Sequence, residues 1–143
     1  MTVIEYLSRP EAIRHEINRK ALRVQVLRRH AQRITAAMRD VRVKSTPDPA
    51  RMQAFLSEAA DEEKAIAGLQ QELAQVLDET AIYLSFLPQE QMEQILELRY
   101  LAGMEWKEIA RLTGYFLSSV YRLHTQALRL LPPPPEVPDG DQL

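Results

Sequence analysis

Two long runs of apolar side chains, each with alternating spacings of three and four residues, constrain this chain more than any other feature. Such spacing puts the apolar residues on one stripe of an α-helix and is typical of a coiled-coil seam. The first run covers residues 13–41 and the second covers residues 52–83. Their polar members are Lys20, Glu62 and Thr80. We therefore expect two long helices that pack along narrow seams.

The segment between the two runs favours a reversal of the chain. Residues 44–49 include two prolines, which disfavour helical geometry at their own positions and at the residues before them. Ser8 and Glu11 have the spacing of a capping box, which predicts the start of the first helix. The sequence thus predicts an antiparallel coiled-coil hairpin with arms at about 9–43 and 50–86.

The two predicted arms carry opposite charge, although the whole chain has a net charge of only −2. Residues 1–46 hold 11 Lys/Arg and 4 Asp/Glu, whereas residues 47–88 hold 2 and 8. We expect the first arm's arginines to pair with the acidic arm or to face solvent, with DNA backbone contact as the alternative. With a turn near residue 46, Lys20 and Glu62 are not expected to face each other.

A second part of the chain follows Leu87-Pro88 and has shorter helical patterns. Gly103 and Gly114 are placed as helix stops, because glycine adopts the left-handed conformation without steric cost. The last residues are rich in proline and acid and should be extended or disordered. The predicted organisation is all-α: a hairpin at 1–87, a domain at 88–131 with helices at 89–102, 106–113 and 117–131, and a disordered tail at 132–143.

A short helix, a tight turn at Gly114 and a longer helix have the sequence form of a helix-turn-helix. A DNA major groove admits one α-helix, whose first turns reach base edges. The phasing predicts a core-facing set: Ile109, Ala110, Leu112, Val120, Leu123, Ala127 and Leu130. The outward set predicted to meet base edges is Leu117, Ser118, Tyr121, Arg122 and Thr125, and the set predicted to contact the DNA backbone is Lys107, Arg111 and Ser119.

Charge supports that orientation modestly. Residues 109–131 contain three arginines and no acid, whereas residues 89–108 contain five acids and two cations. DNA affinity depends largely on neutralised phosphates, and three cations are few. Further affinity is expected from a homodimer paired through the hairpin, from the basic first arm, or from a partner such as RNA polymerase.

Several segments resemble region four of the sigma factors of bacterial RNA polymerase. They are Leu87-Pro88, the run from Ile95 to Gly103, the run from Trp106 to Ala110, Gly114-Tyr115, the run from Val120 to His124, and Ala127-Leu128. With the hairpin, the chain resembles phage and prophage regulators of the ArpU and RinA type. The resemblance implies a helix-turn-helix, double-stranded promoter DNA as partner, a role in transcription, and the cytoplasm of a bacterial host.

The starts of two predicted helices depart from the pattern of that family. Glu105 stands where the second helix usually begins with a Ser or Thr cap. Phe116 and Leu117 stand where a Ser cap and a polar residue are usual. A missing cap costs about 0.5–2 kcal/mol, unless Ser118 caps a later start. Leu117 can touch a thymine methyl group or bury against a protein partner.

Other classes of function lack support in the sequence. The chain has no cysteine, no phosphate-cradling glycine loop and no nucleophile motif. His15, His30 and His124 are isolated and lack ligand spacing. No apolar run reaches the ~18 residues needed to span a bilayer, and the first residues do not form a secretory signal. We expect no enzyme, cofactor, metal or membrane association.

The leading hypothesis is a sequence-specific transcription regulator of phage or prophage origin. One alternative keeps DNA as the partner and assigns the protein to genome packaging, as a recognition subunit. The other abandons DNA, and makes the same fold a protein-interaction adaptor with Phe116 and Leu117 as its apolar contact patch.

Overall fold

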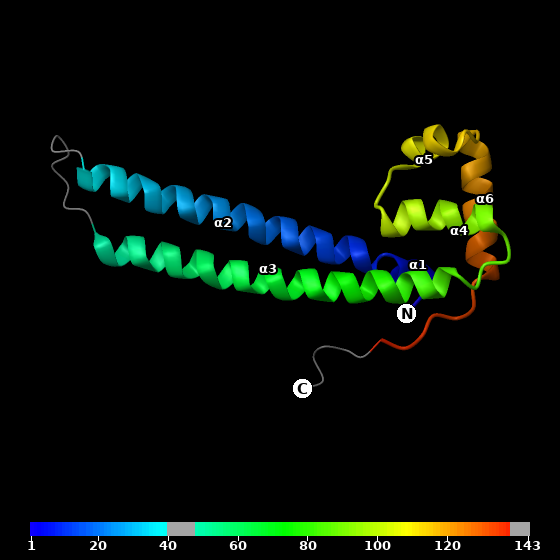
Figure 1. Cartoon of the computed structure of the whole chain (residues 1–143), viewed down its shortest axis with the longest axis horizontal. Coiled ribbons are helices and arrows are strands. Elements are labelled where there is room, and N and C mark those ends of the chain that lie inside the picture. Colours follow the sequence, from blue (N-terminus) through cyan, green and yellow to red (C-terminus); the bar gives the residue numbers. More distant parts are fainter. Residues whose placement is uncertain (40–47, 138–143) are drawn as a thin grey trace. The chain divides into compact units, whose positions relative to one another are not determined.

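The computed structural model describes residues 1–39 and 48–137, and among these there is no β-strand. The expected all-α class with a long pair of helices is confirmed. The predicted turn near residue 46 lies outside the described residues. The elements are α1 (Val3–Leu7), α2 (Arg9–Arg39), α3 (Pro49–Leu84), α4 (Glu90–Leu96), the π-helix η1 (Glu97–Leu101), α5 (Trp106–Thr113) and α6 (Leu117–Leu130), shown in Figure 1.

The chain divides into two compact units, each described by itself below. Unit 1 comprises Met1–Ala12 together with Leu73–Leu143, and unit 2 comprises Ile13–Glu72. Helices α2 and α3 each contribute residues to both units.

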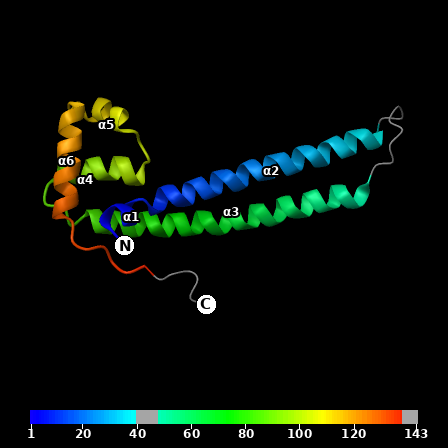
Figure 2. The same cartoon turned by 180° about the vertical axis from the view of Figure 1, so that it is seen from behind.

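Unit 2 is an antiparallel pair of helices with a thin core. Its buried residues are Val24 and Leu27 of α2 and Ala59 of α3, with Phe55 and Ile66 partly buried against them. These residues belong to the two predicted seams. The helices lie side by side in both Figure 1 and Figure 2. The small side chain of Ala59 lets the two backbones approach closely, as expected for a narrow coiled-coil seam.

Ion pairs connect the two arms, as their opposite charges predicted. Arg23 lies 3.7 Å from Glu58, and Arg28 forms an ion pair with Glu63. The expectation for Lys20 and Glu62 was wrong, because Lys20 Nζ lies 3.3 Å from Glu62 Oε2. The expectation considered only how far along the hairpin each residue's backbone lies. The long stems of lysine and glutamate span an offset along the helices, which brings their charged ends together.

The first predicted arm starts where the sequence placed it, since α2 begins at Arg9, but a separate short helix, α1, precedes it. The Glu5 N–H donates to Thr2 Oγ1 at 3.1 Å, and the Thr2 N–H donates to Glu5 Oε2 at 2.9 Å. This capping box starts α1 at Val3. Ser8 has helical backbone angles and closes α1, so it is not the expected N-cap. Thr2 and Glu5 have the same capping-box spacing as Ser8 and Glu11. The sequence prediction did not use this earlier capping box and so did not include α1.

The core of unit 1 joins α4, α5 and α6 to α1 and to the end of α3. Helix α4 contacts α6, and the two helices run in different directions in Figure 2. The fully buried side chains share a large apolar surface, which is the main favourable contribution to folding. The buried set is Tyr6, Leu7, Tyr83, Leu84, Leu87, Met92, Ile95, Leu96, Ile109, Val120, Ala127 and Leu131.

Two of the predicted core positions are exposed instead. The exposed fraction is 65% for Leu112 and 53% for Leu130, while Leu131 is buried. Leu112 lies at the flank of a short helix whose inner side is already occupied by Ile109 and Ala110. Helix α6 ends at Leu130, so the extended backbone of Leu131 turns its side chain inward.

The helix predicted at 89–102 is interrupted by a change of geometry. It is α-helical over Glu90–Leu96 and then a π-helix over Glu97–Leu101. The Ala102 N–H donates to the Glu97 carbonyl at 3.0 Å, which is the five-residue spacing of a π-turn. Gly103, with a φ of 71°, follows as the predicted left-handed stop. A 3.6-residue period cannot reveal such a widened turn.

The beginning of the C-terminal tail packs against the core of unit 1. Residues 132–137 have neither helix nor strand. The Tyr83 hydroxyl donates to the Pro132 carbonyl, and Val137 packs against the core. The expectation of disorder for residues 138–143 concerns residues outside the described part of the chain.

Two glycines give a matched test of the backbone argument. Gly114 has a φ of 78°, Gly68 lies within α3, and a Cβ at either position meets nothing within 4 Å. Gly114→Ala should destabilise unit 1 by about 1–2 kcal/mol, because an L side chain opposes the left-handed conformation. Gly68→Ala should stabilise unit 2 by about 0.5–1 kcal/mol. Calorimetric unfolding measures both, and a neutral Gly114→Ala would contradict the account.

Candidate nucleic-acid interface

The connection between α5 and α6 is a tight turn built around Gly114. The Gly114 N–H donates to the Ala110 carbonyl at 3.0 Å and closes α5. The Thr113 hydroxyl donates to the Ile109 carbonyl at 2.7 Å and accepts the Tyr115 N–H at 3.4 Å. These bonds hold the backbone on both sides of the glycine, so α6 starts in a defined direction.

The inner side of α6 is fixed by burial. Val120 and Ala127 are completely buried, and Leu123 packs against the same core from a partly exposed position. Ile109 of α5 is also completely buried. Because an α-helix turns by 100° per residue, burying these positions sets which side chains α6 presents to solvent.

The structure places most of the predicted contact residues on the exposed side of α6. Ser118, Tyr121, Arg122 and Thr125 are exposed, whereas Leu117 and Ser119 are half-buried. On α5, Lys107 and Arg111 are exposed. Within residues 1–39 and 48–137, no carboxylate forms an ion pair with the predicted contact cations Lys107, Arg111 and Arg122.

Two of these side chains also have contacts within the protein. The Thr125 hydroxyl donates to the Tyr121 carbonyl at 3.0 Å, so its proton is already engaged and only its oxygen can still accept. The ring of Tyr121 lies 5.4 Å from the ring of Trp106, measured between centroids. Tyr121 is therefore held against α5, with its orientation restricted before any ligand arrives.

An aromatic cluster that the sequence did not reveal braces α6 against η1. The Tyr100 hydroxyl lies 2.7 Å from His124 Nε2, and the His124 ring packs edge-on against Trp106 at 4.6 Å. The Arg99 guanidinium lies 4.6 Å from the centre of the Trp106 ring and donates to the Met104 carbonyl at 3.0 Å. His124 was interpreted as isolated, because its partners are distant in sequence.

The cluster favours an uncharged imidazole. Burial, and secondarily the Arg99 cation, lower the pKa of His124 below its ordinary 6.5. Burial is also the main cause that raises the pKa of Tyr100. A neutral His124 and a neutral Tyr100 hydroxyl therefore share one hydrogen bond across the space between η1 and α6.

The helix starts lack side-chain caps, as the two sequence departures indicated. Neither Glu105 before α5 nor Phe116 before α6 forms a side-chain capping bond. Ser118 does not shift the start of α6, since the helix begins at Leu117. Phe116 is 82% exposed, which is unusual for an aromatic side chain at a turn.

Two further properties of the described residues bear on function. No group of three or more His, Asp or Glu side chains in the described part of the chain is arranged to hold a metal ion. None of the described helices combines the length and the apolar composition needed to cross a bilayer.

Comparisons of the chain with protein-family models, with curated proteins and with solved structures gave no match.

The neutral His124 gives unit 1 a predictable dependence on pH. Because the folded pKa lies below the unfolded value of about 6.5, this contribution to stability is complete above that pH and declines as the pH falls below it. Thermal unfolding between pH 7.5 and 5 should show this decline. His124→Gln keeps a hydrogen-bonding partner for Tyr100 and should flatten it.

His30→Gln is the matched control, because His30 stacks on Phe55 in unit 2 and its replacement leaves the Tyr100–His124 bond intact. An unchanged pH dependence of unit 1 in His124→Gln would show that His124 is not its source.

Proposed function

We propose that this protein is a sequence-specific DNA-binding regulator of transcription. In this proposal α5 and α6 form a helix-turn-helix, α6 enters the major groove, and the protein is encoded by a phage or prophage and acts at promoters in the bacterial cytoplasm. One observation carries the proposal. The Ser118, Tyr121 and Arg122 side of α6 is exposed, while Val120 and Ala127 hold the opposite side in the core.

The exposed side chains have chemistry suited to reading base edges. An arginine such as Arg122 can donate two hydrogen bonds to the O6 and N7 acceptors of guanine. The Ser118 and Tyr121 hydroxyls can donate or accept, and the Thr125 oxygen can accept. Leu117, half-buried at the start of α6, offers an apolar contact for a thymine methyl group.

Phosphate contacts would come from α5 and from the start of α6. Lys107 and Arg111 are exposed, and Ser119 is partly accessible. The start of α6 lacks a side-chain cap, so its first backbone N–H groups can donate to a phosphate oxygen. No acidic side chain lies between residues 109 and 131 to oppose the anion.

With so few cations on α5 and α6, a single copy would have low affinity for DNA. We propose that a second copy, paired through the hairpin of α2 and α3, supplies a second reading helix. Two such helices would meet half-sites separated by about one turn of DNA, roughly 34 Å. RNA polymerase is a further partner that the resemblance to sigma factors suggests.

A second candidate function is that of a protein-interaction adaptor. Its support is the side chain of Phe116, which is 82% exposed, because a large apolar side chain at a surface can mark a protein contact. This candidate requires that the protein does not shift the mobility of a DNA fragment at low salt, and that Phe116→Ala abolishes binding to a protein partner.

Replacing Arg122 tests the DNA proposal. Arg122→Ala should weaken binding to the preferred sequence by about 1–3 kcal/mol and relax the preference at one base pair. Lys107→Ala should instead weaken binding to all sequences equally and reduce the salt slope by about 1. Fluorescence anisotropy titrations at several salt concentrations distinguish these outcomes.

The matched control is Arg19→Ala, since Arg19 is an exposed arginine of the hairpin that pairs with Glu16. Its replacement should leave the preference between sequences unchanged. If the affinity and salt slope of Arg122→Ala equal those of the unaltered protein, Arg122 lies outside the interface.

A further inference from the structure

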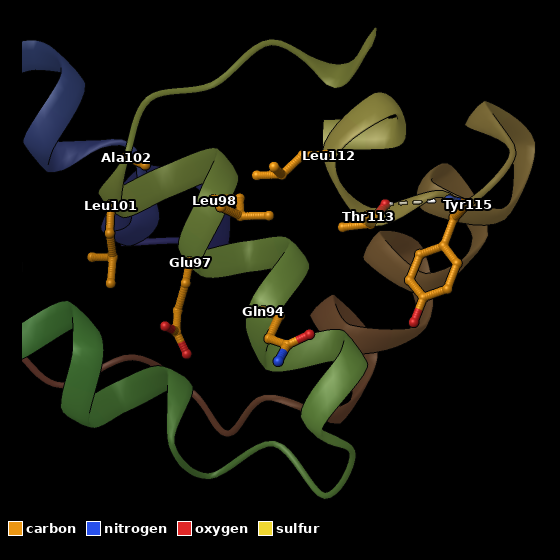
Figure 3. A pocket seen from close by; sticks show the side chains of 8 residues that line it. All are labelled: Gln94, Glu97, Leu98, Leu101, Ala102, Leu112, Thr113 and Tyr115. Carbon is orange, nitrogen blue, oxygen red and sulfur yellow. Dashed lines mark hydrogen bonds between the residues drawn. The ribbon is translucent and has the colours of Figure 1, made fainter. Parts of the chain in front are cut away.

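A groove of about 490 Å³ opens between η1 and the end of α5, with η1 forming one wall (Figure 3). Its apolar lining comes from Leu98 and Leu101 of η1 and from Leu112 of α5. In Figure 3, the side chains of Leu98 and Leu112 point toward each other. Clefts that hold small molecules have volumes of about 300–1,000 Å³, so this groove has room for one.

The apolar lining is incompletely covered by the protein itself. Leu112 is 65% exposed, and Leu98 and Leu101 are only partly buried against the core. Burying such surface is favourable in proportion to its area. A ligand with an apolar body would therefore gain by lying between Leu98 and Leu112.

The one carboxylate that lines this groove among the described residues, Glu97, lacks a positive partner. Glu97 lines the groove beside Gln94, and Glu93 lies one turn earlier on α4. Burial, then the charge of Glu93 and a hydrogen bond to it, raise the pKa of Glu97. Among the described residues no cation forms an ion pair with Glu93 or Glu97. Such an acidic pair is unfavourable, and a nearby cation would relieve it.

The neighbouring cation on η1 is engaged elsewhere. Arg99 lies over the Trp106 ring and donates to the Met104 carbonyl. The π-turn puts Glu97, Leu98 and Leu101 in the wall of the groove, and π-helices occur often at functional sites. Arg99, the cation nearest to Glu97 along η1, is therefore not available to neutralise it.

We propose that this groove binds a small organic cation with an apolar body. Its ammonium or guanidinium group would lie against the Glu97 carboxylate, with Gln94 as a further polar contact, and its hydrocarbon or ring would lie between Leu98 and Leu112. A phosphate-bearing ligand is disfavoured, because Glu93 and Glu97 would repel it. The inference does not depend on DNA binding.

Dansylcadaverine is a suitable probe, because it joins a primary ammonium group to an aromatic fluorophore that brightens in apolar surroundings. Its N-acetylated form is the neutral counterpart with nearly the same apolar body. In titrations of the full chain, the cationic probe should bind at least about tenfold more tightly than the neutral one, since a charged hydrogen bond is lost on acetylation.

Variants assign the two parts of the recognition. Glu97→Gln keeps the shape of the side chain and should weaken the cationic probe about tenfold while leaving the neutral probe unchanged. Leu112→Ala should weaken the binding of both probes by a similar factor. Glu108→Gln, which removes an exposed acid of α5 outside the groove, should change neither. Circular dichroism verifies that each variant remains folded.

Three results would overturn the proposal: equal binding of the two probes, equal binding of the cationic probe by Glu97→Gln and the unaltered chain, or no binding at millimolar probe. Binding of a basic amphipathic peptide in place of the probe would show a protein-docking surface instead. No DNA is present in these titrations, so their failure leaves the proposed regulator role unaffected.

Discussion

The burial of Val120 and Ala127 in the core of unit 1 is the constraint on which the functional interpretation depends. Both side chains are completely buried, as are Ile95 and Ile109 in the elements that pack around them. A helix held at two positions seven residues apart cannot rotate without exposing apolar surface to water. Its Arg122 side must then face solvent. The orientation of the proposed reading helix thus follows from core packing.

The π-helix η1 connects the two candidate sites of unit 1. Through Tyr100 and Arg99 it supports His124 and Trp106, and Trp106 in turn contacts Tyr121. Through Glu97, Leu98 and Leu101 the same five-residue element lines the groove beside α5. A single widened turn of helix therefore both supports α6 and forms a wall of the groove. The groove is acidic and apolar, whereas the exposed side of α6 is basic.

Much of the fold was predictable because it depends on local or periodic signals. The heptad runs predicted α2 and α3, and Gly103 and Gly114 predicted the two left-handed stops. The helical phase of residues 117–131 predicted that Val120 would be buried and Arg122 exposed. Which individual side chains distant in sequence would meet was not predictable, as the Tyr100–His124 bond and the Lys20–Glu62 ion pair show. Leu112 was misplaced because helical phase alone does not say where neighbouring elements leave a groove.

The central claim is that α6 reads base sequence. Its most direct test is the selection of fragments bound by the full chain from the genome that encodes it, at about 50 mM and about 200 mM salt. Recognition through Arg122 and its neighbours predicts a common sequence whose enrichment persists at the higher salt, because base contacts do not depend on released counterions. Enrichment that is uniform across fragments and disappears at the higher salt would contradict the claim.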